Sequence, residues 1–118
     1  MTDPASITGY HAHVYYDAAD KDRAADVRSG VEKKFGDRIT MGRWRDEPVG
    51  PHPRGSYQIA FAPGLFAEIV PWLAFNRRDL VVFVHPETGN DLLDHRDRAL
   101  WLGAGEALNL AMFKGGEG

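Results

Sequence analysis

The chain has 118 residues, 43% of them hydrophobic, which is enough for one buried core and about the size of one domain. It contains no cysteine, which excludes disulfides and thiolate metal sites and leaves histidine nitrogens and oxygen atoms as metal ligands. Its formal net charge of -3 argues against a nucleic-acid partner, because such proteins usually carry a basic surface.

Targeting signals are not apparent in the sequence. The N-terminal residues lack the pattern of a signal peptide, and no window approaches 18 consecutive apolar residues. We therefore expect one cytoplasmic domain over residues 1–118, with no membrane partner. Residues 1–6 and 114–118 are expected to be flexible ends.

The spacing of apolar residues predicts six elements. In chain order they are a strand at 7–16, a helix at 18–35, strands at 38–45 and 57–61, a helix at 64–76 and a strand at 80–84. The segment 46–55 holds three prolines and two glycines, which favours a loop, and Pro71 predicts a kink in the second helix. Beyond a turn at 86–90 we expect a short helix near 91–98 and a final segment at 106–113.

This order of elements is that of the ferredoxin-like βαββαβ sandwich, an α+β fold. We expect a four-stranded, mainly antiparallel sheet with both helices on one face. In this interpretation the first and third strands lie side by side and parallel in the middle of the sheet. The other face is open unless something, such as a second subunit, covers it.

Side chains alternate across a strand, so His11 and His13 are predicted to share one face of the first strand, with Tyr15 further along. The small apolar residues Ala12 and Val14 then point towards the helices. The two histidines are thus expected on the open face of the sheet.

Two further histidines are predicted to join this pair. His52 precedes the third strand and His85 ends the fourth, and in the expected topology these points lie at the same edge of the sheet as the start of the first strand. Imidazoles with open coordination positions suit Fe(II), Zn, Cu or Ni. We therefore predict a metal or catalytic cluster, although each histidine alone could be a packed or solvated imidazole.

Other residues carry weaker signals. His95 is a candidate general acid or base near neutral pH, or a surface residue in a charged turn. Arg77 and Arg78 could hold a substrate carboxylate, or form a solvated helix end. The carboxylates that could complete a 2-His-1-carboxylate triad, if they are not turn or cap residues, are Glu87, Asp91, Asp94 and Asp97. The aromatic residues expected in the core or an interface are Trp44, Trp72, Trp101 and Tyr57.

Six segments resemble the DOPA 4,5-dioxygenase family, in its small fungal and bacterial type. The segments are 10–17 (YHAHVYYD), 50–53 (GPHP), 57–61 (YQIAF), 72–77 (WLAFNR), 84–91 (VHPETGND) and 94–103 (DHRDRALWLG). They occur in the order typical of the family and together cover most of residues 8–104.

This resemblance implies an extradiol dioxygenase that inserts O2 into a catechol such as L-DOPA or caffeic acid and gives a ring-opened semialdehyde. It also implies Fe(II) as the metal, for which a crystal could show Zn or Ni, and a homodimer. The matched histidines are His11, His13, His52, His85 and His95, whereas Arg98 stands where members often carry another histidine.

From the residues and the resemblance together we expect His11, His13, His52 and His85 as metal ligands. Catalytic roles are expected for His95, His85 and His52, and substrate contacts for Arg77, Arg78 and Tyr15. Three alternatives stay open. They are a non-catalytic dimeric module that binds a metal or a small aromatic ligand, a Zn-dependent hydrolase or isomerase on the same histidines, and a purely structural domain.

Overall fold

The computed structural model describes residues 3–113. Its centre is one five-stranded sheet of order β2-β3-β1-β4-β5 in which all neighbours are antiparallel. The strands are β1 (Gly9–Tyr16), β2 (Ile39–Met41), β3 (Gly55–Phe61), β4 (Val82–Glu87) and β5 (Leu100–Leu102). The helices are α1 (Lys21–Phe35), α2 (Phe66–Asn76) and α3 (Asp91–His95), with short 3-10 turns at Pro4–Ser6, Ala18–Asp20, Gly36–Arg38 and Pro63–Leu65.

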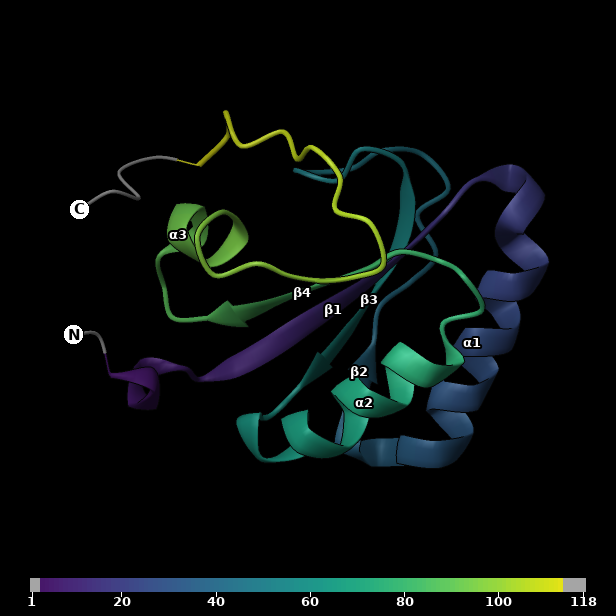
Figure 1. Cartoon of the computed structure of the whole chain (residues 1–118), viewed down its shortest axis with the longest axis horizontal. Coiled ribbons are helices and arrows are strands. Elements are labelled where there is room, and N and C mark those ends of the chain that lie inside the picture. Colours follow the sequence, from purple (N-terminus) through teal and green to yellow (C-terminus); the bar gives the residue numbers. More distant parts are fainter. Residues whose placement is uncertain (1–2, 114–118) are drawn as a thin grey trace.

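Two helices, α1 and α2, cover one face of the sheet, and α3 lies on the other side with the C-terminal segment (Figure 1). The helix-covered face holds the core, in which Ala12 and Val14 of β1 are fully buried, as predicted. The α1 residues facing them recur at the predicted helical spacing, and they are Ala24, Val27, Val31 and Phe35. Burial of each large apolar side chain contributes about 1.5–3 kcal/mol, so this face anchors β1 firmly.

The α+β class and the antiparallel sheet are confirmed, as is a short helix after the fourth strand. The predicted number of four strands is wrong, because Leu100–Leu102 pair with the outer edge of β4 as a fifth strand. Three residues are too few to show a period of two, which is why the sequence did not reveal this strand.

The predicted parallel pairing of the first and third strands is also wrong. The β1–α1–β2 crossover makes β1 and β2 run in the same direction, and β3 lies between them, antiparallel to both. The start of β3 therefore meets the end of β1, where Gly55 pairs with Tyr16. The helical crossover permits β1 and β2 to share a direction, and the direct β2–β3 connection reverses the chain, so β3 is antiparallel to both.

The strand predicted at 38–45 ends at Met41. The chain nevertheless stays beside β3, because the Gly42 amide donates to the Gln58 carbonyl at 2.7 Å and Arg45 forms an isolated β-bridge with Ser56. Between these two points Trp44 packs edge-on against Tyr57, with 5.0 Å between ring centroids. This places Trp44 on the helix-covered face, as expected for a core residue.

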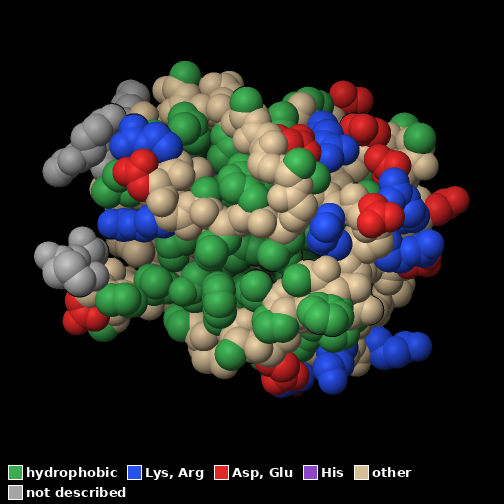
Figure 2. Space-filling model, in the orientation of Figure 1, with side chains coloured by type: hydrophobic (Ala, Val, Ile, Leu, Met, Phe, Trp, Pro, Cys, Tyr) green, Lys and Arg blue, Asp and Glu red, His purple; other side chains and the backbone are tan. Residues whose placement is uncertain are grey.

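The second face of the sheet is covered by segments of the same chain. The Asn109 amide donates to the Pro51 carbonyl at 2.9 Å, so the C-terminal segment contacts the β2–β3 loop. In Figure 2, which shows the molecule in the orientation of Figure 1, hydrophobic side chains fill the centre, charged ones lie mainly towards the edges, and no histidine is visible. This covering removes the open face on which the expectation of a dimer partly depended.

The expected flexible ends are only partly described. Residues 1–2 and 114–118 lie outside the described residues, whereas Pro4–Ser6 form a 3-10 turn that the Asp3 side chain caps. In the described part of the chain, no helix combines the length and the apolar character needed to cross a membrane.

Candidate metal centre

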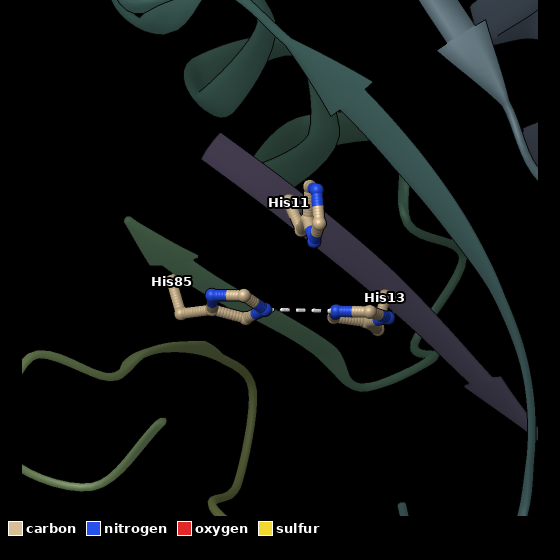
Figure 3. Close-up of side chains that lie close together, drawn as sticks. All are labelled: His11, His13 and His85. Carbon is tan, nitrogen blue, oxygen red and sulfur yellow. Dashed lines mark hydrogen bonds between the residues drawn. The ribbon is translucent and has the colours of Figure 1, made fainter. Parts of the chain in front are cut away.

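The centre of the site is a pair of imidazoles on adjacent strands, His13 of β1 and His85 of β4. His11 and His13 project from the same face of β1, and the register places His85 of β4 directly opposite His11. The Nε2 atoms of His13 and His85 are 3.0 Å apart, and the His11 ring lies beside them (Figure 3). One nitrogen from each of these three residues lies within 4.8 Å of the other two.

This arrangement fits a divalent transition metal. His13 is 4% exposed and His85 is 1% exposed, so water has little access to their ring nitrogens. Two imidazole nitrogens bound at about 2.1 Å to one ion, at a right angle, are about 3.0 Å apart, which is the observed spacing of the two Nε2 atoms. Three neutral imidazoles match the ligand preference of Fe, Zn, Cu and Ni.

The outer nitrogens of two of these three histidines are held by neighbouring oxygens. The Pro86 carbonyl lies 3.0 Å from His85 Nδ1, and because a carbonyl only accepts, Nδ1 carries the hydrogen and Nε2 keeps its lone pair. Glu87 Oε1 lies 2.9 Å from His11 Nδ1 and so orients this ring in the same way. Such outer contacts fix the tautomer that a metal requires.

Glu87 therefore gives a testable prediction. Glu87→Ala should weaken metal binding by about 10–100-fold, because His11 loses the acceptor that orients it. Glu87→Gln should lose less, since its amide oxygen still accepts from Nδ1. Competition with a chelator measures both constants, with Asp97→Ala as the control for removal of an exposed carboxylate. Wild-type affinity in Glu87→Ala would show that the contact has no role in the site.

Burial keeps the cluster neutral. Desolvation, followed by repulsion from the other histidines, lowers the pKa of His13 well below its ordinary value. Burial likewise lowers the pKa of His85 to about 3 and that of His52 to about 4. Burial together with Asp91 and Asp94 raises the pKa of Glu87. At neutral pH the imidazoles thus offer lone pairs, which a metal ligand must do.

His52 reaches the cluster by a different route from the one expected. Because β3 starts beside the end of β1, His52 approaches past Tyr15, whose hydroxyl is 2.8 Å from His52 Nδ1. Its ring centroid is 4.2 Å from that of His13. His52 is thus part of the cluster, but it lies outside the three residues whose nitrogens group together as a metal site.

His95 lies over the cluster on α3. Its ring centroid is 4.0 Å from that of His85, and Phe113 covers its other side at 4.5 Å. The Asp91 carbonyl is 2.7 Å from Nδ1, so Nδ1 donates to it and Nε2 is the nitrogen left for other contacts. His95 is 9% exposed, so it is not the surface residue that the alternative interpretation required.

A buried polar network fixes α3 and therefore His95. Asp94 is fully buried and accepts from Arg98 at 2.9 Å and from the Thr88 hydroxyl at 2.8 Å. Arg98 thus balances a buried carboxylate. Of the other carboxylates considered as ligands, Asp97 pairs with Arg96, and Glu87 contacts a ligand ring.

The arginines predicted to bind substrate are engaged elsewhere. Arg78 forms an ion pair with Asp26 of α1, on the helix-covered face. Arg77 donates to the Leu80 carbonyl at 2.9 Å, near the turn at Gly103. These contacts join the α2–β4 connection to α1 and to the start of β4.

Sequence reasoning named Glu87 only as a possible direct ligand and missed its contact with His11. The separation of His85 and Glu87 by two residues places both on one face of a strand, which is a signal that could have linked them. The covering contact of Phe113 has no comparable signal, since no period relates a tail residue to α3.

Fold and site together define a protein of mixed helices and antiparallel strands with a buried histidine cluster that could bind a transition-metal ion. The comparisons with known proteins agree with this class. The chain belongs to the Dopa 4,5-dioxygenase family, whose model matches residues 10–112.

Two curated relatives and one solved structure are similar to this chain. A DOPA 4,5-dioxygenase of Amanita muscaria is 35% identical over 114 residues, with 91% of this chain and 50% of the relative covered. An uncharacterised 21.2 kDa protein of Botryotinia fuckeliana is 32% identical over 116 residues, covering 89% and 63%. The chain thus spans between half and two thirds of the length of these relatives. A crystal structure of a protein from Nostoc punctiforme, proposed to be a dioxygenase, matches with a TM-score of 0.90 and 52% identity over 93% of this chain and 94% of that one.

Proposed function

We propose that this protein is a metal-dependent extradiol dioxygenase that opens the ring of a catechol such as L-DOPA or caffeic acid. The observation that carries the proposal is the pair of buried Nε2 atoms, 3.0 Å apart, with His11 beside them. Family membership supports dioxygenase activity. The ferredoxin-like arrangement, the homodimer and the cytoplasmic location stay predictions from the sequence.

His11, His13 and His85 would hold the metal through their inner nitrogens. The chemistry that Fe(II), our proposed metal, would supply there is Lewis acidity and redox reactivity. The three neutral imidazoles would add no charge of their own to the metal site. Catechol and O2 are therefore the proposed partners, and both oxygen atoms enter the product as one ring carbon–carbon bond breaks.

Two further histidines can move or hold protons. His95 Nε2 carries a lone pair and can take a proton from a catechol hydroxyl. Burial raises the pKa of Tyr15, so its hydroxyl stays protonated and can donate to His52 Nδ1. In that tautomer His52 presents Nε2–H, which can donate a hydrogen bond to a substrate oxygen. We propose His95 as the general base and His52 as the donor.

The test is anaerobic loading with Fe(II), followed by caffeic acid or L-DOPA in air. We expect O2 uptake together with a new visible absorbance from the ring-opened product. A chelator should abolish both signals, and Zn-loaded protein should show neither. Stoichiometric metal without O2 uptake would reject the dioxygenase and favour a binding module or a hydrolase on the same histidines.

A further inference from the structure

A cavity of about 390 Å³ lies beside the histidine cluster. The residues that line it include His13 and His52 of the histidine cluster and Gln58 of β3. A volume of about 300–1,000 Å³ is typical of sites for small molecules. Because His13 also belongs to the candidate metal group, a ligand in this cavity can reach the metal centre at one end.

Two exposed arginines, Arg43 and Arg45, line the same cavity, and the backbone indicates which face of the sheet they occupy. The Arg45 amide and carbonyl pair with Ser56 at 2.9 and 2.8 Å, so the two side chains lie on the same face of the sheet. Ser56 is opposite Tyr15, which is on the histidine face. Arg43 lies two residues before Arg45, and Trp44 between them packs on the helix-covered face. Alternation thus directs both guanidinium groups to the histidine side.

The charge of the cavity is one-sided. Among the described residues that line it are Arg43 and Arg45, but no aspartate or glutamate. The adjacent Asp46 is already paired, because it binds Lys21 Nζ at 2.9 Å and accepts from Tyr16 at 2.8 Å. Two cations in one wall, in a chain whose net charge is -3, form a site for an anion.

The other arginines around the cluster are occupied by carboxylates. Arg54 makes a bidentate contact with Glu106 at 3.1 and 2.6 Å. Arg98 is bound to the buried Asp94. Arg43 and Arg45 are therefore the cations best placed to receive a negatively charged part of a ligand that extends from the metal centre.

We infer that Arg43 and Arg45 form an anion subsite that binds the side-chain carboxylate of the catechol. This inference deepens the proposed function and depends on it for the identity of the aromatic end. A catechol whose side chain carries only a carboxylate can place its ring oxygens at the metal centre and its carboxylate at the two arginines. A zwitterionic side chain brings an ammonium group to two guanidinium groups, and a catechol amine lacks the anion altogether. The expected order of affinity is dihydroxyphenylpropionate first, L-DOPA second and dopamine last.

The test measures binding to the Zn-loaded protein, in which no ring cleavage is expected, by calorimetry. For the wild type, 3-(3,4-dihydroxyphenyl)propionate should bind at least tenfold more tightly than dopamine. The double variant Arg43→Gln/Arg45→Gln should lose at least tenfold in affinity for the propionate, and each single variant should lose part of this. Lys33→Gln, which removes an exposed cation of α1, is the matched control and should stay within twofold of wild type.

Two results would overturn the subsite: wild-type propionate affinity in a folded double variant, or equal affinities for propionate and dopamine in the wild type. The Fe(II)-loaded enzyme adds a second measurement. Its ratio of kcat/KM for the propionate over that for 4-methylcatechol should fall at least tenfold in the double variant. Charge-dependent binding without O2 uptake would reject the dioxygenase and retain the subsite. O2 uptake without charge-dependent binding would retain the dioxygenase and reject the subsite.

Discussion

His13→Ala should abolish tight metal binding, and with it O2-dependent ring cleavage. Its Nε2 is the group 3.0 Å from His85 Nε2, and the side chain is buried, so water does not easily replace the missing ligand. The loss should exceed the roughly 10–100-fold expected for an outer contact such as Glu87. His85→Ala should behave in the same way, because it removes the other nitrogen of the pair.

Metal content after dialysis and O2 uptake with caffeic acid measure this effect. Thr40→Ala, at an exposed position of β2, is the control and should match wild type. In the metal-free protein His13→Ala leaves His85 Nε2 without its partner, which costs about 1–3 kcal/mol of the free energy of unfolding. Circular dichroism at low temperature therefore has to show a folded variant. A folded His13→Ala that kept stoichiometric metal and full ring cleavage would refute the metal centre.

The metal-free protein should lose stability steeply below neutral pH. The folded state holds His85 and His52 neutral, with pKa values of about 3 and about 4, whereas the unfolded chain protonates them near 6.5. Groups with a lowered folded pKa stabilise the fold fully above the unfolded value, and this contribution is lost as the pH falls towards the folded value. Between pH 6.5 and pH 5 each histidine costs about 2 kcal/mol, at about 1.4 kcal/mol per pKa unit.

Urea unfolding of chelator-treated protein at pH 7, 6 and 5 measures this slope. We expect a loss on the order of 4 kcal/mol for these two histidines, which is a large part of the usual 5–15 kcal/mol of a domain. Glu87 acts in the opposite direction, because burial raises its folded pKa, but only close to its ordinary value of 4.5. Bound metal should reduce the loss as long as it outcompetes protons. Constant stability of the metal-free protein from pH 7 to pH 5 would show that the histidines are not held neutral.

Local patterns account for much of the fold. The helical spacing in α1 and the alternation in β1 are set by which residues meet the core, so they could be read from the sequence. The direction of β3 and the existence of β5 could not be predicted from the sequence. Strand pairing depends on which crossover precedes each strand and on free edge hydrogen bonds, and neither is visible in the composition of a short segment.

The candidate site divides in the same way. His11, His13 and His85 follow from a period of two and one strand pairing, and the structure brings these three together. His52 was expected near them because the third strand was predicted to run parallel to the first, which the sheet contradicts. It lies near His13 because the loop before β3 places it beside the end of β1. The partners of Arg77 and Arg78 could not be predicted, since two adjacent basic residues in a sequence do not reveal which carboxylate or carbonyl binds them.

The His11–His85 pairing has a consequence for how this site can change over time. Both residues are fixed by the register of β1 on β4, and the alternate positions of β1 form the core under α1. An insertion or deletion of one residue in β1 would turn the histidines towards the helices and the core residues towards the cavity. Descendants of this chain can therefore lose the histidine cluster by single substitutions, whereas a shift of β1 by one residue would disrupt the cluster and the core together.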